Sequence, residues 1–401
     1  MNASSAIPIR VLHLLPDFDL GGGQVVLRQT IGALQGPEWQ HIVVAFGGGP
    51  LLGPYREDGI RCEMLGNHRT TDWPAAFGRL VQLVRSEDVD VIVSLNTPLD
   101  RTMAQLCAVV TRRPVVVWFM SMAIRLLAFP PPLRRTLAFF KRLALYPFNY
   151  SSVRLLAAHV ANSEATAQSF ADHLRLSTDR FEIVPPGLPQ RAFDHSLTDA
   201  ERYELRGRLG LHDAFPVLLN VGMLIPLKGQ LHLIETLERL TDEFPDAHLL
   251  LVGEGPDRPV LESRIADSSA RDRIHLLGHR TDVQDLLRIS DTLVTASRSE
   301  GFGLSVLEGM ASALPVVGVR TPAFLEFLEE GVTAELVDDQ DAEQLARAVR
   351  AVFTDPARAA SMGALARERA LEYRVDLRAA AFGDVLRSVA TRSKRRPQRS
   401  G

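Results

Sequence analysis

Two glutamates, Glu300 and Glu308, lie eight positions apart in a glycine-containing stretch that runs from Ser297 to Ala311. An apolar run precedes this stretch and another follows it, so we predict a loop between two strands that leads into a short helix. Gly301 and Gly303 let the backbone turn tightly and approach a ligand without interference from a Cβ atom. The helix N-terminus would offer unpaired N–H groups and a partial positive charge to a phosphate. With carboxylates to accept hydroxyl groups, the stretch suits a ligand that has a central diphosphate and a sugar at each end.

One of the two glutamates also has a simpler interpretation. Ser305 and Glu308 have the spacing of a capping box, in which a glutamate only closes the first backbone N–H groups of a helix. Two glutamates that bracket Gly-Phe-Gly between two strands are harder to explain by capping alone. The stretch also closely resembles the E-x7-E signature (EGFGLPxxEAMAxGxPVV) of family 4 of the retaining glycosyltransferases. This resemblance implies the two-domain GT-B architecture and a nucleotide-diphosphate sugar as donor.

The rest of the sequence must supply the elements that position this stretch. Short apolar runs alternate with longer helical patterns, which is typical of parallel sheets with helices on both faces. Twelve candidate strands are too many for one such sheet, and a polar segment between Pro185 and Pro216 interrupts the pattern. We therefore predict an α/β protein with two Rossmann-like domains and a cleft between them. The resemblance implies that they form the GT-B architecture, with parallel sheets that face each other across the cleft. The predicted strands are Ile9–Leu15, His41–Phe46, Val89–Leu95, Val115–Phe119, Ala157–Ala161, Phe181–Val184, Val217–Val221, His248–Val252, Ile274–Leu277, Thr292–Thr295, Val316–Gly318 and Ala334–Val337.

The chain has 401 residues, enough for two domains that each bury a core of their own. We place an N-terminal acceptor domain at residues 1–190 and a C-terminal nucleotide-sugar donor domain at residues 191–374. The helical pattern at 375–391 is similar to the segment that crosses back to the first domain in the GT-B fold. Residues 392–401 form a basic tail that we expect to be disordered.

Composition argues against several other classes of protein. The net charge of −3 gives no reason to expect nucleic acid as a partner. The only cysteines, Cys62 and Cys107, support neither a disulfide framework nor a cysteine zinc site. No apolar run approaches the roughly 18 residues that a membrane-spanning helix needs, and no signal-peptide pattern precedes the first strand. We expect a cytoplasmic protein.

A second motif lies in the segment Asn220–Gly229, which is similar to the family's VGRLxxxKG. In the family, the arginine and the lysine of this motif neutralise the donor diphosphate. Lys228 matches the lysine, whereas Met223 stands where arginine is common. Lys228 also attracts attention without the resemblance, because only three of the 45 basic residues are lysines. A lysine between a strand and a helix suits a compact point charge on phosphate, although its presence by chance is an alternative.

Further donor-binding residues follow from the resemblance. Gly21–Gly23, after the first strand, is similar to the family's glycine loop near the donor phosphates. We expect a helix to begin after it, at Gln24. A second triplet, Gly47–Gly49, is expected to be a plain turn. Other candidates end later strands, where open α/β sheets bind ligands, although turn chemistry alone also explains some of them. The full predicted donor site is Gly22, Gly23, Gly222, Met223, Lys228, Gly253, His279, Arg280, Glu300, Gly301, Phe302, Gly303, Leu304, Ser305 and Glu308.

The resemblance also implies roles for these residues. Glu300 and Lys228 would be catalytic: Glu300 would hold sugar hydroxyls and stabilise the cationic transition state, and Lys228 would take the charge that grows on the leaving diphosphate. Glu308 would accept hydrogen bonds from the ribose. The fixed positive groups occupy the place of a metal, so we predict neither metal nor cofactor. The D-x-D sequence Asp88–Asp90 lies at a helix-to-strand junction, where solvated acids are common, and we assign it no metal.

The acceptor side departs from the family pattern. Members often have a histidine just after the fourth strand, where this chain has Trp118-Phe119-Met120-Ser121. Retaining transfer does not require that histidine, because the donor phosphate serves as the base in the front-face mechanism proposed for the family. Between Arg101 and Ser163 there are nine arginines and lysines and no acidic residue. Basic and apolar side chains interleave there on both sides of three prolines, which suits a membrane interface; a helix pair packed on its own sheet is the alternative.

We therefore predict a retaining hexosyltransferase that uses a UDP-sugar as the first candidate donor and GDP-mannose as the second. Its acceptor would be a lipid-linked glycan or glycolipid precursor, reached by peripheral binding to an anionic surface on the inner face of the plasma membrane. A sugar-nucleotide epimerase on the same fold would need no acceptor, and a pyridoxal-dependent phosphorylase is disfavoured by the scarcity of lysine. Outside the enzymes, Met223 and the absent histidine leave a catalytically degenerate GT-B binding or scaffolding protein as the alternative.

Overall fold

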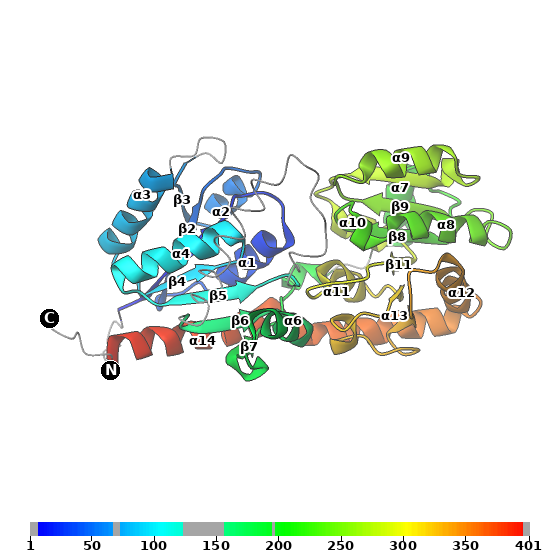
Figure 1. Ribbon diagram of the computed structural model, residues 1–401. Helices are drawn as coiled ribbons and strands as arrows, with labels where there is room; N and C mark the ends of the chain where they lie inside the picture. The colour runs from blue at the N-terminus through cyan, green and yellow to red at the C-terminus, as the bar shows by residue number, and fades with distance from the viewer. Residues whose placement is uncertain (1–6, 67–72, 123–155, 195–196, 396–401) are drawn as a thin grey trace. The chain divides into compact units, whose positions relative to one another are not determined.

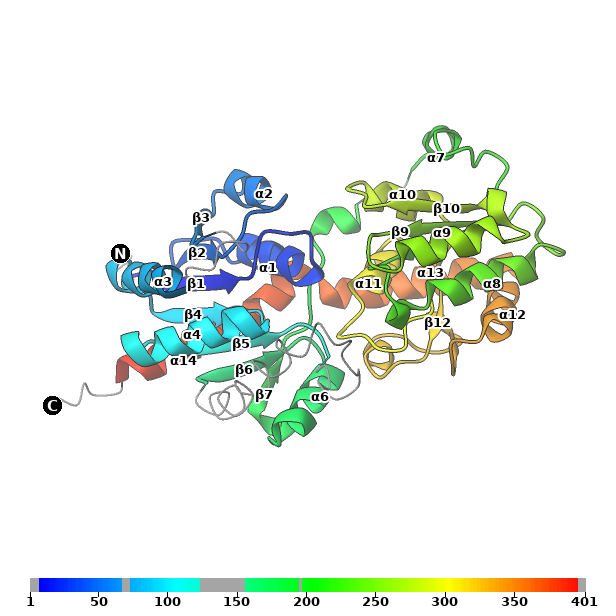
Figure 2. The same cartoon turned by 45° about the horizontal axis from the view of Figure 1, so that its top comes forward.

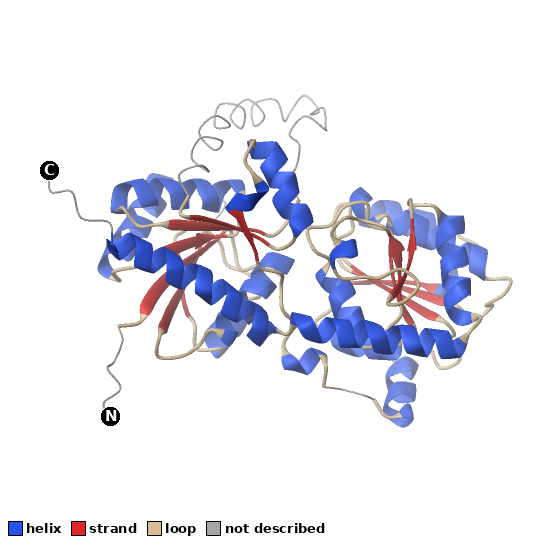
Figure 3. Cartoon of the chain, turned by 90° about the horizontal axis from the view of Figure 1, so that it is seen from below, coloured by secondary structure: helices blue, strands red, loops and turns tan. Residues whose placement is uncertain are grey.

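The structure is a computed structural model that describes residues 7–66, 73–122, 156–194 and 197–395. Contacts along the chain divide it into two compact units, residues 1–187 together with 375–401 (unit 1) and residues 188–374 (unit 2). Each unit contains one wholly parallel sheet with helices packed around it (Figure 1, Figure 3). The predicted α/β class with two Rossmann-like sheets is therefore confirmed.

Unit 1 is built on seven strands in the order β3-β2-β1-β4-β5-β6-β7 (Figure 2). The order of strands reverses between β1 and β4, so a topological switch point lies at their carboxyl ends. The strands are β1 (Ile9–Leu15), β2 (Trp39–Ala45), β3 (Arg61–Met64), β4 (Val91–Ser94), β5 (Val115–Phe119), β6 (Ala158–Ala161) and β7 (Phe181–Ile183). The helices are α1 (Gly22–Ala33), α2 (Leu52–Glu57), α3 (Trp73–Ser86), α4 (Pro98–Thr111), α6 (Glu164–Leu174) and α14 (Val375–Arg395).

Strand β3 is the one strand of the described chain that sequence patterns did not predict. It pairs with β2 at an edge of the sheet, from Ile42 opposite Arg61 to Ala45 opposite Met64. It is four residues long and none of its side chains is fully buried. An edge strand needs no continuous apolar run because it is not enclosed by neighbours on both sides. The twelve predicted strands are all present, with ends shifted by a few residues.

Helix α14 packs against unit 1 through one apolar face. Ala379, Phe382, Leu386 and Val389 are buried at the three- and four-residue spacing of a helix face. Phe382 stacks on Trp118 of β5 with 4.3 Å between ring centroids. This stacking holds α14 against β5.

The helix also continues further than predicted. We expected it to end at residue 391, but it extends to Arg395, so 392–395 are helical rather than part of a disordered tail. Lys394 Nζ lies 3.0 Å from the buried carboxylate of Asp90. Basic residues in a last turn are favoured by the helix dipole, and this ion pair ties the turn to the sheet. The remainder of the predicted tail, 396–401, lies outside the described residues.

Unit 2 is built on six strands in the order β10-β9-β8-β11-β12-β13. Its switch point lies between β8 and β11. The strands are β8 (Val217–Val221), β9 (His248–Val252), β10 (Ile274–Gly278), β11 (Thr292–Thr295), β12 (Val316–Val319) and β13 (Ala334–Val337). The helices are α7 (Asp199–Gly207), α8 (Gln230–Leu240), α9 (Arg258–Ala266), α10 (Val283–Ile289), α11 (Leu304–Ala311), α12 (Ala342–Phe353) and α13 (Pro356–Ala370).

A pair of histidines joins neighbouring strands in each sheet. His13 Nε2 and His41 Nδ1 lie 3.0 Å apart between β1 and β2. His248 Nδ1 and His275 Nε2 lie 2.9 Å apart between β9 and β10. Burial disfavours the charged ring, so it lowers the pKa of His41 and of His248 to about 4 and also lowers the pKa of His13 and His275. Both pairs are therefore neutral in the folded protein at physiological pH.

We expect the free energy of unfolding to decrease as the pH falls from about 6.5 to about 4. The unfolded chain takes up protons on these histidines near pH 6.5, whereas the folded chain takes them up at lower pH, near pH 4 for His41 and His248, so acid favours the unfolded state. For the well-buried His41, the difference between the two pKa values corresponds to about 3 kcal/mol. Urea denaturation at pH 7.5 and pH 5 measures this effect. His41→Gln should make the free energy of unfolding less dependent on pH, whereas the control His232→Gln should not change this dependence. An equal pH dependence in wild type and His41→Gln would contradict the expectation.

Candidate active site

The switch point of unit 2 brings the two predicted catalytic residues together. Lys228 follows β8 and Glu300 follows β11, and the two loops are joined by a hydrogen bond from Arg298 N to Leu227 O at 3.0 Å. Gly229 has a φ of +66°, and a Cβ atom there would lie 2.5 Å from the carbonyl oxygen of Ala296. The close contact between these loops therefore depends on a glycine directly after Lys228.

Lys228 and Glu300 form an ion pair. Lys228 Nζ lies 2.5 Å from Glu300 Oε1, and the side chains are 22% and 13% exposed. Charge-assisted hydrogen bonds of this kind are stronger when they are shielded from water. A diphosphate that approaches Lys228 would therefore compete with the Glu300 carboxylate for the lysine ammonium group.

Helix α11 begins beside this ion pair, and its N-terminus is open. Gly303 is the N-cap residue with a φ of +103°, and a Cβ atom at this position would lie 2.4 Å from Phe324 Cε1. No side chain caps the helix, so the capping box between Ser305 and Glu308 is not formed. The backbone N–H groups of Leu304 and Ser305 have no acceptor among the described residues, as the first turn of an uncapped helix requires. These groups are available to an anion.

Glu308 is half-buried in α11. Within the described chain, its carboxylate has no hydrogen-bond donor, and burial raises its pKa to about 7. A carboxylate in such surroundings lacks the partners that normally offset desolvation. Hydroxyl groups of a ligand would supply those partners.

The side chain of Phe302 lies in the core of unit 2. Its side chain is only 3% exposed and lies between Phe327 and Tyr373, with ring centroids 4.7 Å and 5.5 Å away. The ring therefore anchors the glycine loop in the core of unit 2, which leaves only the backbone of Phe302 for a ligand. Gly301 and Gly303, on either side, allow the chain to enter and leave this buried position.

The loops after β8, β9 and β10 contact one another through their backbones. A Cβ atom on Gly253, which has a φ of +140°, would lie 1.9 Å from Gly222 O. Gly253 N also donates to Gly278 O at 2.9 Å. Gly253 is therefore required for packing between loops, whether or not it contacts a ligand, whereas Gly222 itself has room for a side chain.

The remaining predicted donor-site residues of unit 2 differ in their solvent exposure and in whether protein groups already bind them. Met223 is 58% exposed, and His279 is exposed as well. Arg280 is paired with Asp282 through two hydrogen bonds of 2.8 Å and 2.6 Å. This guanidinium group holds the pKa of Asp282 below its usual range, so Arg280 is not an uncommitted cation.

In unit 1, the predicted glycine loop is the first turn of a helix. Helix α1 begins at Gly22 with Gly21 as N-cap, two residues before the expected start at Gln24. Gly22 and Gly23 therefore occupy the turn whose N–H groups have no partner within the helix. Gly49 of the second triplet differs, because a Cβ atom there would lie 2.3 Å from the Phe18 carbonyl carbon. That triplet packs one loop against another, in agreement with its interpretation as a turn.

The D-x-D sequence has structural partners. Asp88 pairs with Arg113 at 2.6 Å and with Arg10 at 3.4 Å. Asp90 accepts a hydrogen bond from the Arg10 backbone at 3.0 Å. Among the described residues, no group of three or more His, Cys, Asp and Glu side chains is arranged to hold a metal ion.

Comparisons with known proteins assign the chain to a family. Residues 201–369 match the family model described as Glycosyl transferases group 1, and residues 20–190 match the model described as Glycosyltransferase Family 4. The chain belongs to this glycosyltransferase family.

Two relatives with named activities are similar to parts of this chain. The D-inositol 3-phosphate glycosyltransferase of Xylanimonas cellulosilytica is 32% identical over 61% of this chain and 60% of its own length. The GDP-mannose-dependent alpha-(1-6)-phosphatidylinositol monomannoside mannosyltransferase of Mycolicibacterium smegmatis is 32% identical over 48% of this chain and 52% of its own length. The chain thus matches only about half to three fifths of these relatives.

A solved structure resembles the chain over nearly its whole length. Anabaena HepE, crystallised in complex with UDP and glucose, superposes with a TM-score of 0.81 at 20% identity, covering 95% of this chain and 100% of HepE. This similarity confirms the GT-B fold.

Proposed function

We propose that this protein is a retaining hexosyltransferase that moves a sugar from a nucleotide-diphosphate sugar to an acceptor hydroxyl. The observation that carries the proposal is the Lys228–Glu300 ion pair at the switch point of unit 2. It lies between loops of β8 and β11, next to the open N-terminus of α11 and its unpartnered Glu308. A cation, free amides and two carboxylates match the diphosphate, the sugar and the ribose of such a donor.

In the proposed reaction, the bond between the sugar C1 and the diphosphate oxygen breaks, and a bond from C1 to the acceptor oxygen forms on the same face. The acceptor proton passes to the departing diphosphate. Lys228 and the amides of Leu304 and Ser305 stabilise the negative charge that develops on this diphosphate. Glu300 binds sugar hydroxyls and stabilises the positive charge at C1, and Glu308 accepts hydrogen bonds from the ribose. These fixed groups serve in place of a metal ion.

For the donor, we propose a UDP-sugar first and GDP-mannose second. HepE was crystallised with UDP and glucose, and the Mycolicibacterium relative is named for GDP-mannose. A thermal-shift screen of UDP, GDP and their sugars would test both the donor and the proposed function. A nucleotide sugar at a hundredfold excess over its Kd should stabilise the protein by about 2.7 kcal/mol, which raises Tm by about 5–10 °C for a unit of this size. If neither nucleotide series raises Tm and no donor is hydrolysed, the scaffolding alternative is correct.

For the acceptor, we propose a lipid-linked glycan or a glycolipid precursor. The Mycolicibacterium relative is named for a phosphatidylinositol mannoside, and the stretch from Arg101 to Ser163 is basic and apolar. Most of the proposed membrane-contacting sequence, 123–155, lies outside the described residues. Within the described chain, no helix has the length and apolar character needed to cross a bilayer. We therefore propose peripheral attachment on the inner face of the plasma membrane, mediated by basic side chains at anionic headgroups.

Co-sedimentation with vesicles tests this attachment. The wild type should bind vesicles that contain phosphatidylglycerol at low salt and dissociate at high salt, because each basic residue contributes about 1 kcal/mol and salt screens that attraction. Charge reversal at Arg134, Arg135, Lys141 and Arg142 should abolish binding. Neutral phosphatidylcholine vesicles serve as the control. Binding that is equal in wild type and the reversed variant would refute the membrane proposal and leave the transfer reaction untouched.

A further inference from the structure

The first sheet has a switch point of its own, at the carboxyl ends of β1 and β4. The N-terminus of α1 follows β1, and residues 95–101 follow β4. A Cβ atom on Gly23 would lie 3.6 Å from Leu95 Cδ1 and 3.8 Å from Met120 Cβ. The ends of β4 and β5 therefore meet the first turn of α1, at the edge of the sheet where parallel α/β domains bind ligands.

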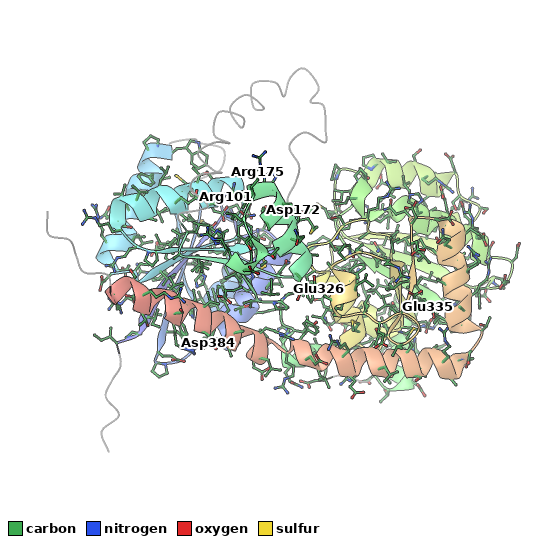
Figure 4. All side chains as sticks on the ribbon, turned by 60° about the horizontal axis from the view of Figure 1, so that its bottom comes forward. Arg101, Asp172, Arg175, Glu326, Glu335 and Asp384 are labelled. Atoms are coloured by element: carbon green, nitrogen blue, oxygen red, sulfur yellow. The ribbon has the colours of Figure 1, made fainter. Side chains whose placement is uncertain are left out.

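Arg101 lies at this edge, in the first turns of α4 (Figure 4). Its Nη1 donates to Asn96 Oδ1 at 2.7 Å. Its Nε is buried and has no hydrogen-bond partner within the described chain. Burial also lowers the pKa of the guanidinium group. The neutral Asn96 side chain orients the arginine, but it cannot balance its charge.

The nearest carboxylate is already committed to other groups. Asp100 is fully buried and accepts hydrogen bonds from Ser94 Oγ at 2.9 Å and from Thr97 Oγ1. Burial raises the pKa of Asp100 to about 6. Among the described residues, no carboxylate forms an ion pair with Arg101. A cation near a helix N-terminus is also opposed by the helix dipole, so the folded chain holds Arg101 where an anion is needed.

Two asparagines at this edge support a binding site. Asn96 adopts a φ of +66°, a left-handed conformation that is uncommon outside glycine and is concentrated at functional positions. Asn162, after β6, is 4% exposed and donates from Nδ2 to Met120 O at 3.0 Å. Its Oδ1 is buried and has no partner in the described chain. A ligand hydroxyl at this edge would satisfy such an acceptor.

We propose that Arg101, oriented by Asn96, binds an anionic group of the acceptor substrate, a phosphate or a carboxylate that lies close to the hydroxyl to be glycosylated. Asn162 Oδ1 accepts a hydrogen bond from a hydroxyl of the same acceptor. This assignment rests on the proposed transfer reaction and specifies its acceptor as negatively charged. The anionic group belongs either to a soluble sugar phosphate or to the phosphate of a lipid headgroup.

The test measures phosphate binding in the presence of saturating UDP, which fills a diphosphate site elsewhere in the protein. Inorganic phosphate and a hexose 6-phosphate are titrated into the full chain and followed by ligand-observed NMR, with the unphosphorylated hexose as a reference. Loss of a charge-assisted hydrogen-bond pair should weaken phosphate binding about 10- to 100-fold in Arg101→Gln. Arg101→Lys keeps the charge but loses the paired N–H groups, so its phosphate affinity should lie between those of the wild type and Arg101→Gln. If Arg101→Gln fails to fold, this second variant decides the result.

Arg113→Gln is the matched control, because it removes the same charge from the amino end of β5, where Arg113 pairs with Asp88 at 2.6 Å. It should bind phosphate as the wild type does. Arg101-dependent co-sedimentation with phosphatidylglycerol vesicles would identify a lipid phosphate as the source, and Arg101-dependent binding of hexose 6-phosphate alone would identify a soluble acceptor.

Two results would overturn the inference. Equal phosphate affinity in wild type and Arg101→Gln would show that the arginine only supports the Asn96 loop. Loss of Arg101-dependent binding once UDP is added would show that the arginine contacts the donor instead. If neither UDP nor GDP binds, the proposed transfer reaction fails, whereas phosphate binding to unit 1 is still measured by the same titration without nucleotide.

Discussion

Lys228→Ala should lower the turnover of donor by about 10²–10³, the usual effect of removing one group that stabilises transition-state charge. Two consequences of the structure contribute to this loss. The leaving diphosphate loses a cation, and Glu300, whose carboxylate is 2.5 Å from Lys228 Nζ, is left unpaired and repels the diphosphate. The assay is release of nucleotide from the donor, with and without acceptor. Stability should change little, by about 1 kcal/mol, because the pair is partly exposed to solvent.

The control for this prediction is Lys394→Ala. Lys394 also pairs with a carboxylate, that of Asp90 at 3.0 Å, but on the last turn of α14. This variant should turn over the donor at the wild-type rate. A double-mutant cycle with Glu300→Gln would separate the effect on turnover of losing the cation from the effect of leaving the Glu300 carboxylate unpaired. A Lys228→Ala protein that keeps more than half its activity would disprove the assignment.

The two glutamates should respond differently to the same substitution. Glu300→Gln should mainly reduce kcat, because its charge matters most as the sugar becomes cationic. It should also tighten the binding of UDP alone, because Lys228 is then released from a competing carboxylate. Few catalytic residues are expected to improve nucleotide affinity when they are neutralised, so the combination is diagnostic. Weaker binding of UDP to Glu300→Gln would refute competition for Lys228.

Glu308→Gln should mainly raise the donor KM, because contacts to the ribose are the same in the ground state and the transition state. Burial raises the pKa of Glu308 to about 7, so the wild-type KM should also rise as the pH falls through 7 and the carboxylate takes up a proton. Glu308→Gln should lack this pH dependence. KM measured from pH 6 to pH 8 in both proteins is the test. An unchanged KM with a lowered Tm would instead assign Glu308 a purely structural role.

The resemblance to family motifs identified the glycosyltransferase family correctly, and the alternation of strands and helices predicted both parallel sheets. These features can be predicted because they depend on local patterns: apolar runs mark buried strands, and glycines next to charged residues mark loops at strand ends. The pairing of Lys228 with Glu300 was not predictable in this way. It depends on which strands are neighbours in the sheet, and β8 lies beside β11 although 70 residues lie between the end of β8 and the start of β11.

The sequence alone determined the fold class and the family and led to the proposed donor site, since each follows from short-range patterns along the chain. Tertiary structure decided the state of individual side chains. The side chain of Phe302 lies in the core, Glu308 has no capping role, and strand β3 forms without an apolar run because an edge position does not require one. Arg101 appeared in the sequence only as one basic residue among nine. That no carboxylate of the described chain forms an ion pair with it became visible only in the fold, because ion pairing depends on distances in space and not on spacing along the sequence.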